Sequence, residues 1–131
     1  MNFEIYMIVF EKSKKREENY EKCKKILPII NKFTAIDSIN ERKKSIEINN
    51  KNNFNSKKII NDVLRGKLGC NLSQQILWKN HLNSEKEWLL ILEDDTKIEI
   101  DTQENFILRI NELIDYSNLN DSNFIQLETR N

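Results

Sequence analysis

Trp88-Leu89-Leu90-Ile91-Leu92-Glu93-Asp94-Asp95 is the stretch that decides the fold of this chain. Its first five residues are all apolar, which is too short a run for a helix and typical of a strand covered on both faces in the middle of an α/β sheet. Three carboxylates follow directly, and they repel one another where a plain turn would need no charge. Two interpretations stay open: the acids bind a divalent cation, or they form an acidic turn in which Asp95 or Thr96 caps the next element.

The spacing of the three acids suggests which of them would bind an ion. In an extended backbone, Glu93 and Asp95 point to one side of the strand and Asp94 points to the other. Carboxylate oxygens favour magnesium, manganese or calcium over zinc or copper. The sequence therefore predicts Glu93 and Asp95 as a pair of metal ligands.

The rest of the chain alternates between strand-like and helix-like patterns, which predicts a mainly parallel sheet with flanking helices. Ligands of such sheets bind beyond the carboxyl ends of the strands, so we expect residues 10–13, Asp37 and the three acids to lie together. The predicted strands are residues 3–10, 29–36 and 88–92, with short strands at 45–48, 97–100 and 122–127. The predicted helices run from Lys14 to just before Pro28, over 57–65, over 72–82, and onward from Asp101 or Thr102.

Several single residues have a predicted place in this scheme. Gly66 and Gly69 are expected to bracket a turn, with Asn71 capping the helix that follows. His81, late in that helix, is expected to face solvent. The large apolar residues of this region are predicted to be core rather than a sugar-stacking platform: Leu72, Ile76, Leu77, Trp78 and Trp88.

Composition restricts the class of protein. The chain has 131 residues, enough for a single domain. Its 21 basic and 21 acidic residues cancel, which gives no electrostatic reason to expect nucleic acid as a partner. Cys23 and Cys70 do not make a disulfide framework or a metal-ligand pair, and a packed thiol is expected at Cys70 unless the helix start lowers its pKa. We find no signal peptide and no membrane-spanning run, so a cytoplasmic protein is expected.

Four segments occur in a recognisable order. The first is Ile5-Tyr6-Met7-Ile8-Val9 with Lys15-Arg16 after it, the second is Phe33-Thr34-Ala35-Ile36-Asp37, the third is Gly69-Cys70-Asn71-Leu72-Ser73-Gln74, and the fourth is the acidic strand end. Together they resemble the signature of glycosyltransferase family 25, the lipooligosaccharide and collagen galactosyltransferases. The resemblance covers nearly all of this chain but only the first part of a family member.

The resemblance implies a GT-A-like nucleotide-sugar-binding α/β fold in a single domain, 1–131. It also implies a metal-dependent glycosyltransferase of lipopolysaccharide biosynthesis, which moves galactose or glucose from a uridine-diphosphate sugar to a glycan or protein acceptor. Gln74 stands where the family usually has His, and Lys15 where it usually has Asp. These departures keep open a non-catalytic remnant or partner module with the donor-binding fold. A phospho-signalling receiver is a third possibility, but too few residues follow the acids for its remaining βα units.

Site roles follow from the same resemblance. Glu93 and Asp95 would bind Mn²⁺ or Mg²⁺, which offsets charge on the leaving diphosphate. The donor would be bound by Arg16 at its diphosphate, by Asp37 at the ribose or base, by Ser73 at a phosphate or sugar, and by Asp94. From the residues alone, Arg16 could equally be a solvated helix-start arginine, Asp37 a turn residue and Ser73 a local cap.

Overall fold

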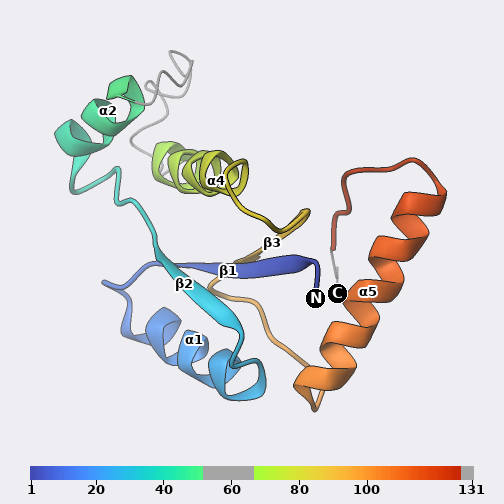
Figure 1. Cartoon of the computed structure of the whole chain (residues 1–131). Helices are drawn as coiled ribbons and strands as arrows, with labels where there is room; N and C mark the ends of the chain where they lie inside the picture. Colours follow the sequence, from blue (N-terminus) through green and yellow to red (C-terminus); the bar gives the residue numbers. More distant parts are fainter. Residues whose placement is uncertain (52–66, 128–131) are drawn as a thin grey trace.

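The computed structural model describes residues 1–51 and 67–127 and shows three parallel strands flanked by helices (Figure 1). This confirms the predicted α/β class with a parallel sheet. The strands are β1 (Phe3–Val9), β2 (Ile30–Thr34) and β3 (Trp88–Glu93). The helices are α1 (Lys14–Ile26), α2 (Arg42–Lys51), α4 (Lys67–His81) and α5 (Gln103–Leu119).

β1, and not β3, is the central strand of the sheet. The strand order is β2-β1-β3, and both neighbours run parallel to β1, with Ile5 opposite Ile30 on one side and Leu90 on the other. The expectation that the strand at 88–92 lies in the middle is therefore wrong for the described residues. Its residues are half-buried rather than fully buried, which is the pattern of a strand with a neighbour on one side only.

The main core lies on one face of the sheet. Alternate residues of β1 point to the same face, and those that begin at Phe3 are almost completely buried. They pack against α1, a helix that the sequence predicted, and against α5. In Figure 1, α1 lies on the opposite side of the strands from α4. The buried residues of this cluster are Phe3, Ile5, Met7, Val9, Tyr20, Cys23, Leu27, Ile30, Phe106, Ile110 and Ile114.

Helix α4 covers the other face of the sheet, and two predictions for its residues are wrong. Leu72 and Leu77 are buried as expected, but Trp78 is 53% exposed, so it is not a core residue. His81 does not face solvent, because its Nδ1 lies 2.6 Å from Oε1 of Glu4 on β1. The end of α4 is therefore tied to the face of β1 opposite the main core.

Gly69 lies inside α4 and not in a turn. A Cβ added at Gly69 would lie 2.1 Å from the carbonyl oxygen of Ile36, so only glycine permits this approach of the helix to the end of β2. The backbone N–H of Gly69 donates to Oγ of Ser38 at 3.0 Å. Asn71 is consequently not a cap, since it lies inside α4, four residues after Lys67.

Three predicted short strands are absent from the described residues. Residues 45–48 belong to α2, where Ser45 is buried and its Oγ donates to the carbonyl oxygen of Glu41, one helical turn earlier. Ile98 and Ile100 pack against the core without pairing to a strand, and residues 122–127 are irregular. The helix predicted over 57–65 lies outside the described residues.

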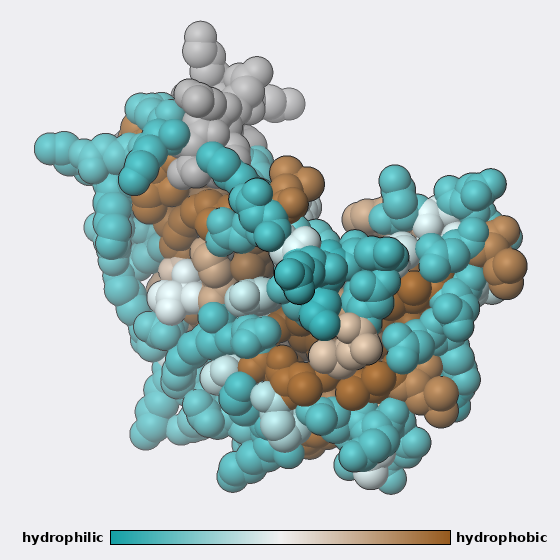
Figure 2. Space-filling view, in the orientation of Figure 1, coloured by the Kyte–Doolittle hydropathy of each residue, from teal (hydrophilic) through white to brown (hydrophobic). Residues whose placement is uncertain are grey.

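α5 begins where the sequence predicted, with Thr102 as its N-cap: Oγ1 of Thr102 accepts from the N–H of Asn105 at 3.2 Å. Its outer side carries exposed apolar residues, among them Leu108, Tyr116 and Leu119. Apolar surface is visible over this part of the molecule at the right of Figure 2. Within residues 1–51 and 67–127, no helix combines the length and the apolar character needed to cross a membrane.

Candidate functional site at the carboxyl edge of the sheet

The carboxyl ends of the three strands meet at one edge, as expected for parallel neighbours. The connection after β1 contacts both of the others. The N–H of Phe10 donates to Oδ2 of Asp94 after β3, at 2.8 Å. Nζ of Lys12 lies 2.7 Å from Oδ2 of Asp37 after β2. The predicted convergence of residues 10–13, Asp37 and the acidic residues is confirmed.

The acidic residues form a tight turn, which we call the acidic turn (residues 93–96). Its closing hydrogen bond runs from the N–H of Thr96 to the carbonyl oxygen of Glu93, at 3.0 Å. The extended backbone therefore ends at Glu93. The alternation that would put Glu93 and Asp95 on one side of a strand does not apply across this turn, and the predicted pairing on that ground is wrong.

Asp94 points into the protein, and both of its carboxylate oxygens are occupied. Oδ2 accepts from the N–H of Phe10, and Oδ1 accepts from Nη1 of Arg16 at 3.0 Å. Its side chain is 16% exposed, against 63% for Asp95. Asp94 therefore fixes the acidic turn to β1 and α1, whereas Asp95 and Glu93 are exposed.

Arg16 stands in the first turn of α1, where Oγ of Ser13, the N-cap, accepts from its backbone N–H at 3.4 Å. The helix start points its side chain toward the acidic turn. Its Nη1 lies 3.0 Å from Asp94 and 3.4 Å from Oδ2 of Asp95. The guanidinium is 40% exposed, so Arg16 is a cation at the edge of the sheet and not simply a solvated residue.

Asn19 is a site residue that the sequence did not reveal. Its Nδ2 donates to the carbonyl oxygens of Asp94, at 3.0 Å, and of Thr96, at 2.8 Å. Cys23, one turn further along α1, contacts the carbonyl oxygen of Thr96 through Sγ at 3.4 Å. The only sequence signal is that Arg16, Asn19 and Cys23 share one face of a helix.

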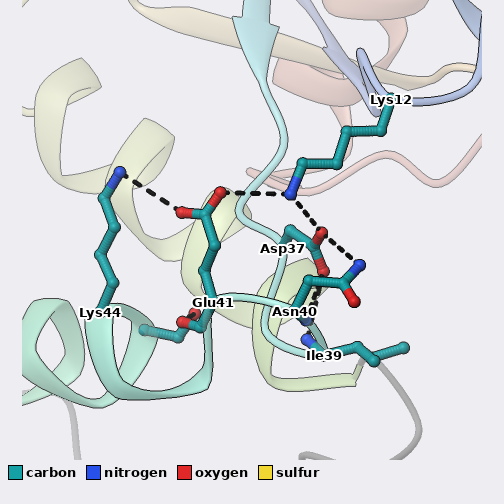
Figure 3. Close-up of polar contacts among 7 residues, drawn as sticks. Lys12, Asp37, Ile39, Asn40, Glu41 and Lys44 are labelled. Atoms are coloured by element: carbon teal, nitrogen blue, oxygen red, sulfur yellow. Dashed lines mark hydrogen bonds and ion pairs between the residues drawn. The ribbon is translucent and has the colours of Figure 1, made fainter.

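A hollow of about 290 Å³ lies between the ends of β1 and β2. Asp37 stands on its wall with its side chain 7% exposed, and Figure 3 shows how its carboxylate is held. Oδ1 accepts from the N–H groups of Ile39 and Asn40, at 3.2 and 3.1 Å, while Lys12 and Nδ2 of Asn40 donate to Oδ2. These donors, Lys12 first, hold the pKa of Asp37 well below its ordinary value.

Lys12 bridges the two walls of the hollow. Its Nζ also lies 3.2 Å from Oε1 of Glu41, which in turn pairs with Lys44 at 3.4 Å (Figure 3). The hydrogen bonds to Asp37 and Glu41 raise the pKa of Lys12, so the ammonium stays charged. Lys12 lies in the connection that follows directly on β1, and its half-exposed side chain therefore reaches the sheet edge.

Ser73 has a different surrounding from the one predicted. It is fully buried inside α4, its Oγ donates to the carbonyl oxygen of Gly69 at 2.7 Å, and the same oxygen accepts from the N–H of Ile36 at 3.0 Å. The idea that it stands at a helix start beside a phosphate is therefore wrong. Ser73 instead fastens α4 to the chain that leads from β2 to Asp37.

Cys70 is an exposed thiol close to the acidic turn. Desolvation, followed by the charges of Glu93 and Asp94, raises its pKa, so neither a packed thiol nor an activated one is present. Cys23 is buried, and its pKa is raised by burial. Among residues 1–51 and 67–127, no group of three or more His, Cys, Asp or Glu side chains is arranged to hold a metal ion by itself.

The sequence model of one protein family matches residues 2–130: glycosyltransferase family 25, described as LPS biosynthesis proteins. The match covers nearly the whole chain. Neither a curated protein nor a solved structure matches the chain significantly. The family match therefore stands on the sequence pattern, and the edge geometry described above is independent of it.

Proposed function

The chain belongs to glycosyltransferase family 25, and on this premise we propose that it binds a nucleoside-diphosphate sugar at the carboxyl edge of the sheet and transfers the sugar with the help of a divalent cation. The observation that carries the proposal is the exposed carboxylate of Asp95, which lies 3.4 Å from the guanidinium of Arg16, with the exposed Glu93 at the start of the same turn. An acid pair that can bind a cation, beside a cation that can bind phosphate, is an arrangement that suits a metal–diphosphate complex.

The residues present fit a manganese or magnesium ion that is shared with the donor. Glu93 and Asp95 offer only oxygen ligands, and both are exposed. Such ions are often bound by one or two carboxylates and complete their coordination with water and substrate phosphates. The lack of a third ligand among the described residues therefore argues for an ion that arrives with the diphosphate rather than one held in a closed cage.

Each residue of the edge then has a chemical task. The ion held by Glu93 and Asp95 would supply positive charge where the leaving diphosphate gains negative charge. Arg16 retains N–H groups beyond the Nη1 that contacts the two aspartates, and it can donate them to a phosphate oxygen. The hollow on the other side of Phe10 gives room for the nucleoside, with Asp37 on its wall.

We propose a uridine-diphosphate hexose, with galactose or glucose as the sugar and a glycan or protein as the acceptor. Support for this comes from the family, whose description places its members in lipopolysaccharide biosynthesis. Ser73 is left out of the donor contacts because its hydroxyl already makes two hydrogen bonds inside the protein. The two free thiols support a reducing compartment such as the cytoplasm.

A second candidate function is a donor-binding module that carries out no transfer. The observation in its favour is the engagement of Arg16 by Asp94 and Asp95, which already neutralises the guanidinium in the free chain. Gln74, in place of the His usual in the family, agrees with this alternative. Such a module would bind the nucleotide sugar but would not release uridine diphosphate from it.

Calorimetric titration of uridine diphosphate in the presence of manganese tests the proposal. We expect binding by the wild-type chain and a loss of at least about tenfold in affinity, or about 1.4 kcal/mol, when Glu93→Gln and Asp95→Asn are combined. The control combines Glu104→Gln with Asp115→Asn, which changes the net charge equally on the exposed side of α5. A folded wild-type chain that binds no nucleotide, or equal losses in both double variants, would refute the donor site.

Release of uridine diphosphate from its galactose and glucose conjugates separates the two candidates. Turnover that disappears in the Glu93→Gln, Asp95→Asn variant supports the transferase. Binding without any release, with acceptor glycans present, supports the non-catalytic module. The release assay uses the same protein samples as the titration, so a folding defect would affect both measurements.

A further inference from the structure

The acidic turn is held to α1 by a side chain with no charge of its own. Asn19 donates two hydrogen bonds from Nδ2 to carbonyl oxygens of this turn, one of Asp94 and one of Thr96. The two acceptors stand on either side of Asp95. The amide therefore fixes the backbone on both sides of the exposed carboxylate that we assign to the cation.

Asn19 is well placed to keep that backbone in one position. It is half-buried on α1, one helical turn after Arg16, and it faces the acidic turn together with Cys23, whose Sγ also contacts Thr96. The hydrogen bond from Thr96 to Glu93 closes the turn itself but does not tie it to the rest of the protein. That tie is made by Asn19, together with the contacts of Asp94 to Phe10 and Arg16.

We propose that Asn19 is a positioning residue of the donor site: it holds the acidic turn so that Asp95 stays beside Arg16, where the two side chains can meet a metal–diphosphate. This inference rests on the proposed function and adds a residue to it. Asn19 touches neither ion nor donor; it acts through the backbone that carries Asp95. Loss of an outer residue that orients metal-binding groups typically lowers affinity or activity ten- to a hundredfold.

Chemistry gives this role a signature that simple packing lacks. Asn19→Ala removes both donors, whereas Asn19→Asp keeps the shape but places carboxylate oxygens against two carbonyl oxygens. The isosteric variant should therefore be the more harmful of the two.

The matched control is Gln103→Ala. Oε1 of Gln103 accepts from the N–H of Ile29 at 3.1 Å, so this variant also removes a contact between a side-chain amide and the backbone. Ile29 immediately precedes β2, at the amino edge of the sheet, away from the acidic turn. Gln103→Ala should therefore lower the melting temperature without changing nucleotide affinity.

The experiment is calorimetric titration of uridine diphosphate with saturating manganese into the wild type, Asn19→Ala, Asn19→Asp and Gln103→Ala, with melting temperatures measured on the same samples. We expect affinity to fall about tenfold in Asn19→Ala and further in Asn19→Asp, and to stay within about twofold in Gln103→Ala. If Asn19→Ala does not fold, Asn19→Ser, which keeps one donor, takes its place and should show a smaller loss than Asn19→Asp.

The possible failures are distinct. A wild type that binds while the Asn19 variants bind equally well overturns the positioning role and leaves the donor site standing. An equal loss in Gln103→Ala also overturns it, because general destabilisation would then explain the effect. A folded wild type that binds no nucleotide overturns the donor site and, with it, the task assigned to Asn19.

Discussion

Replacing Gly69 with alanine should destabilise the protein, although helix propensity alone predicts the reverse. Gly69 lies within α4, and alanine in a helix interior is favoured over glycine by about 1 kcal/mol. Against this, the new Cβ would lie 2.1 Å from the carbonyl oxygen of Ile36 and 3.2 Å from the N–H nitrogen of Ser38. Both neighbours are backbone atoms, so the helix must move rather than a side chain.

The magnitude follows from what that movement disturbs. Overpacking typically costs about 1 to 3 kcal/mol. Two hydrogen bonds cross the same contact, from Gly69 to Oγ of Ser38 and from the N–H of Ile36 to Oγ of Ser73, and each contributes about 1 kcal/mol. After subtracting the propensity gain, the net loss is about 2 to 4 kcal/mol, a sizeable part of the 5 to 15 kcal/mol that is usual for a domain.

Urea denaturation followed by far-ultraviolet circular dichroism measures this loss. The control is Asn80→Ala, an exposed position of the same helix, where the change should stay within about 0.5 kcal/mol. A free energy of unfolding for Gly69→Ala that equals or exceeds the wild-type value would refute the close approach between α4 and the end of β2. A loss near 2 kcal/mol with an unchanged denaturant slope would support it.

Three further predictions concern single side chains. Asp37→Asn should lower the free energy of unfolding by about 2 kcal/mol at pH 7. Because the folded-state pKa of Asp37 lies below its ordinary value of 3.8, this stability is present above about pH 4 and is lost as the pH falls. Denaturation curves of the two proteins should therefore approach each other between about pH 4 and pH 2. A neutral alkylating reagent should label Cys70 but not Cys23 in the folded chain, and more slowly than it labels a free thiol at pH 8, as mass spectrometry would reveal. Glu4→Gln should lower the melting temperature by weakening the contact with His81, a loss of about 1 kcal/mol, and unchanged melting would contradict the contact.

The elements whose pattern is local could be predicted from the sequence. The helix predicted from Lys14 to just before Pro28 is α1, and Thr102 marked the start of α5. The parallel arrangement followed from the alternation of these elements. Sheet order did not, because the apolar run at 88–92 reads the same at the edge of a sheet as in its middle.

The wrong secondary-structure predictions concern residues whose type or pattern occurs in more than one kind of element. Gly69 looks like a helix breaker, yet it lies in a helix because a side chain would collide with Ile36. Residues 45–48 alternate between polar and apolar, which suggests a strand, but Ser45 and Ile48 also share a helix face with Glu41, and the helix is what forms. These choices depend on tertiary neighbours, which no local pattern contains.

For the candidate site, chain topology predicted which segments meet but not which atoms do. That residues 10–13, Asp37 and the acidic residues converge followed from the parallel strands, whereas Arg16 was assigned from the family resemblance. The contacts of Asn19 join positions 75 and 77 residues apart in the sequence, and no spacing rule selects an asparagine within a charged helix. Lys12 lies within residues 10–13, which were expected to meet Asp37, but the sequence did not show that its ammonium group would be the contact.

The motif residues of the family fall into two groups in this structure: those that hold elements together and those that are exposed at the sheet edge. Gly69 and Ser73 make contacts that dock α4 onto the end of β2, and Asp94 is turned inward to β1 and α1, so these three shape the edge without facing it. Glu93 and Asp95 are the ones left exposed at that edge. A motif can therefore be preserved in a chain because the fold needs it, even where no ligand touches it. Substitution of the exposed acids and of Arg16, rather than of the full motif, is therefore the direct test of nucleotide binding.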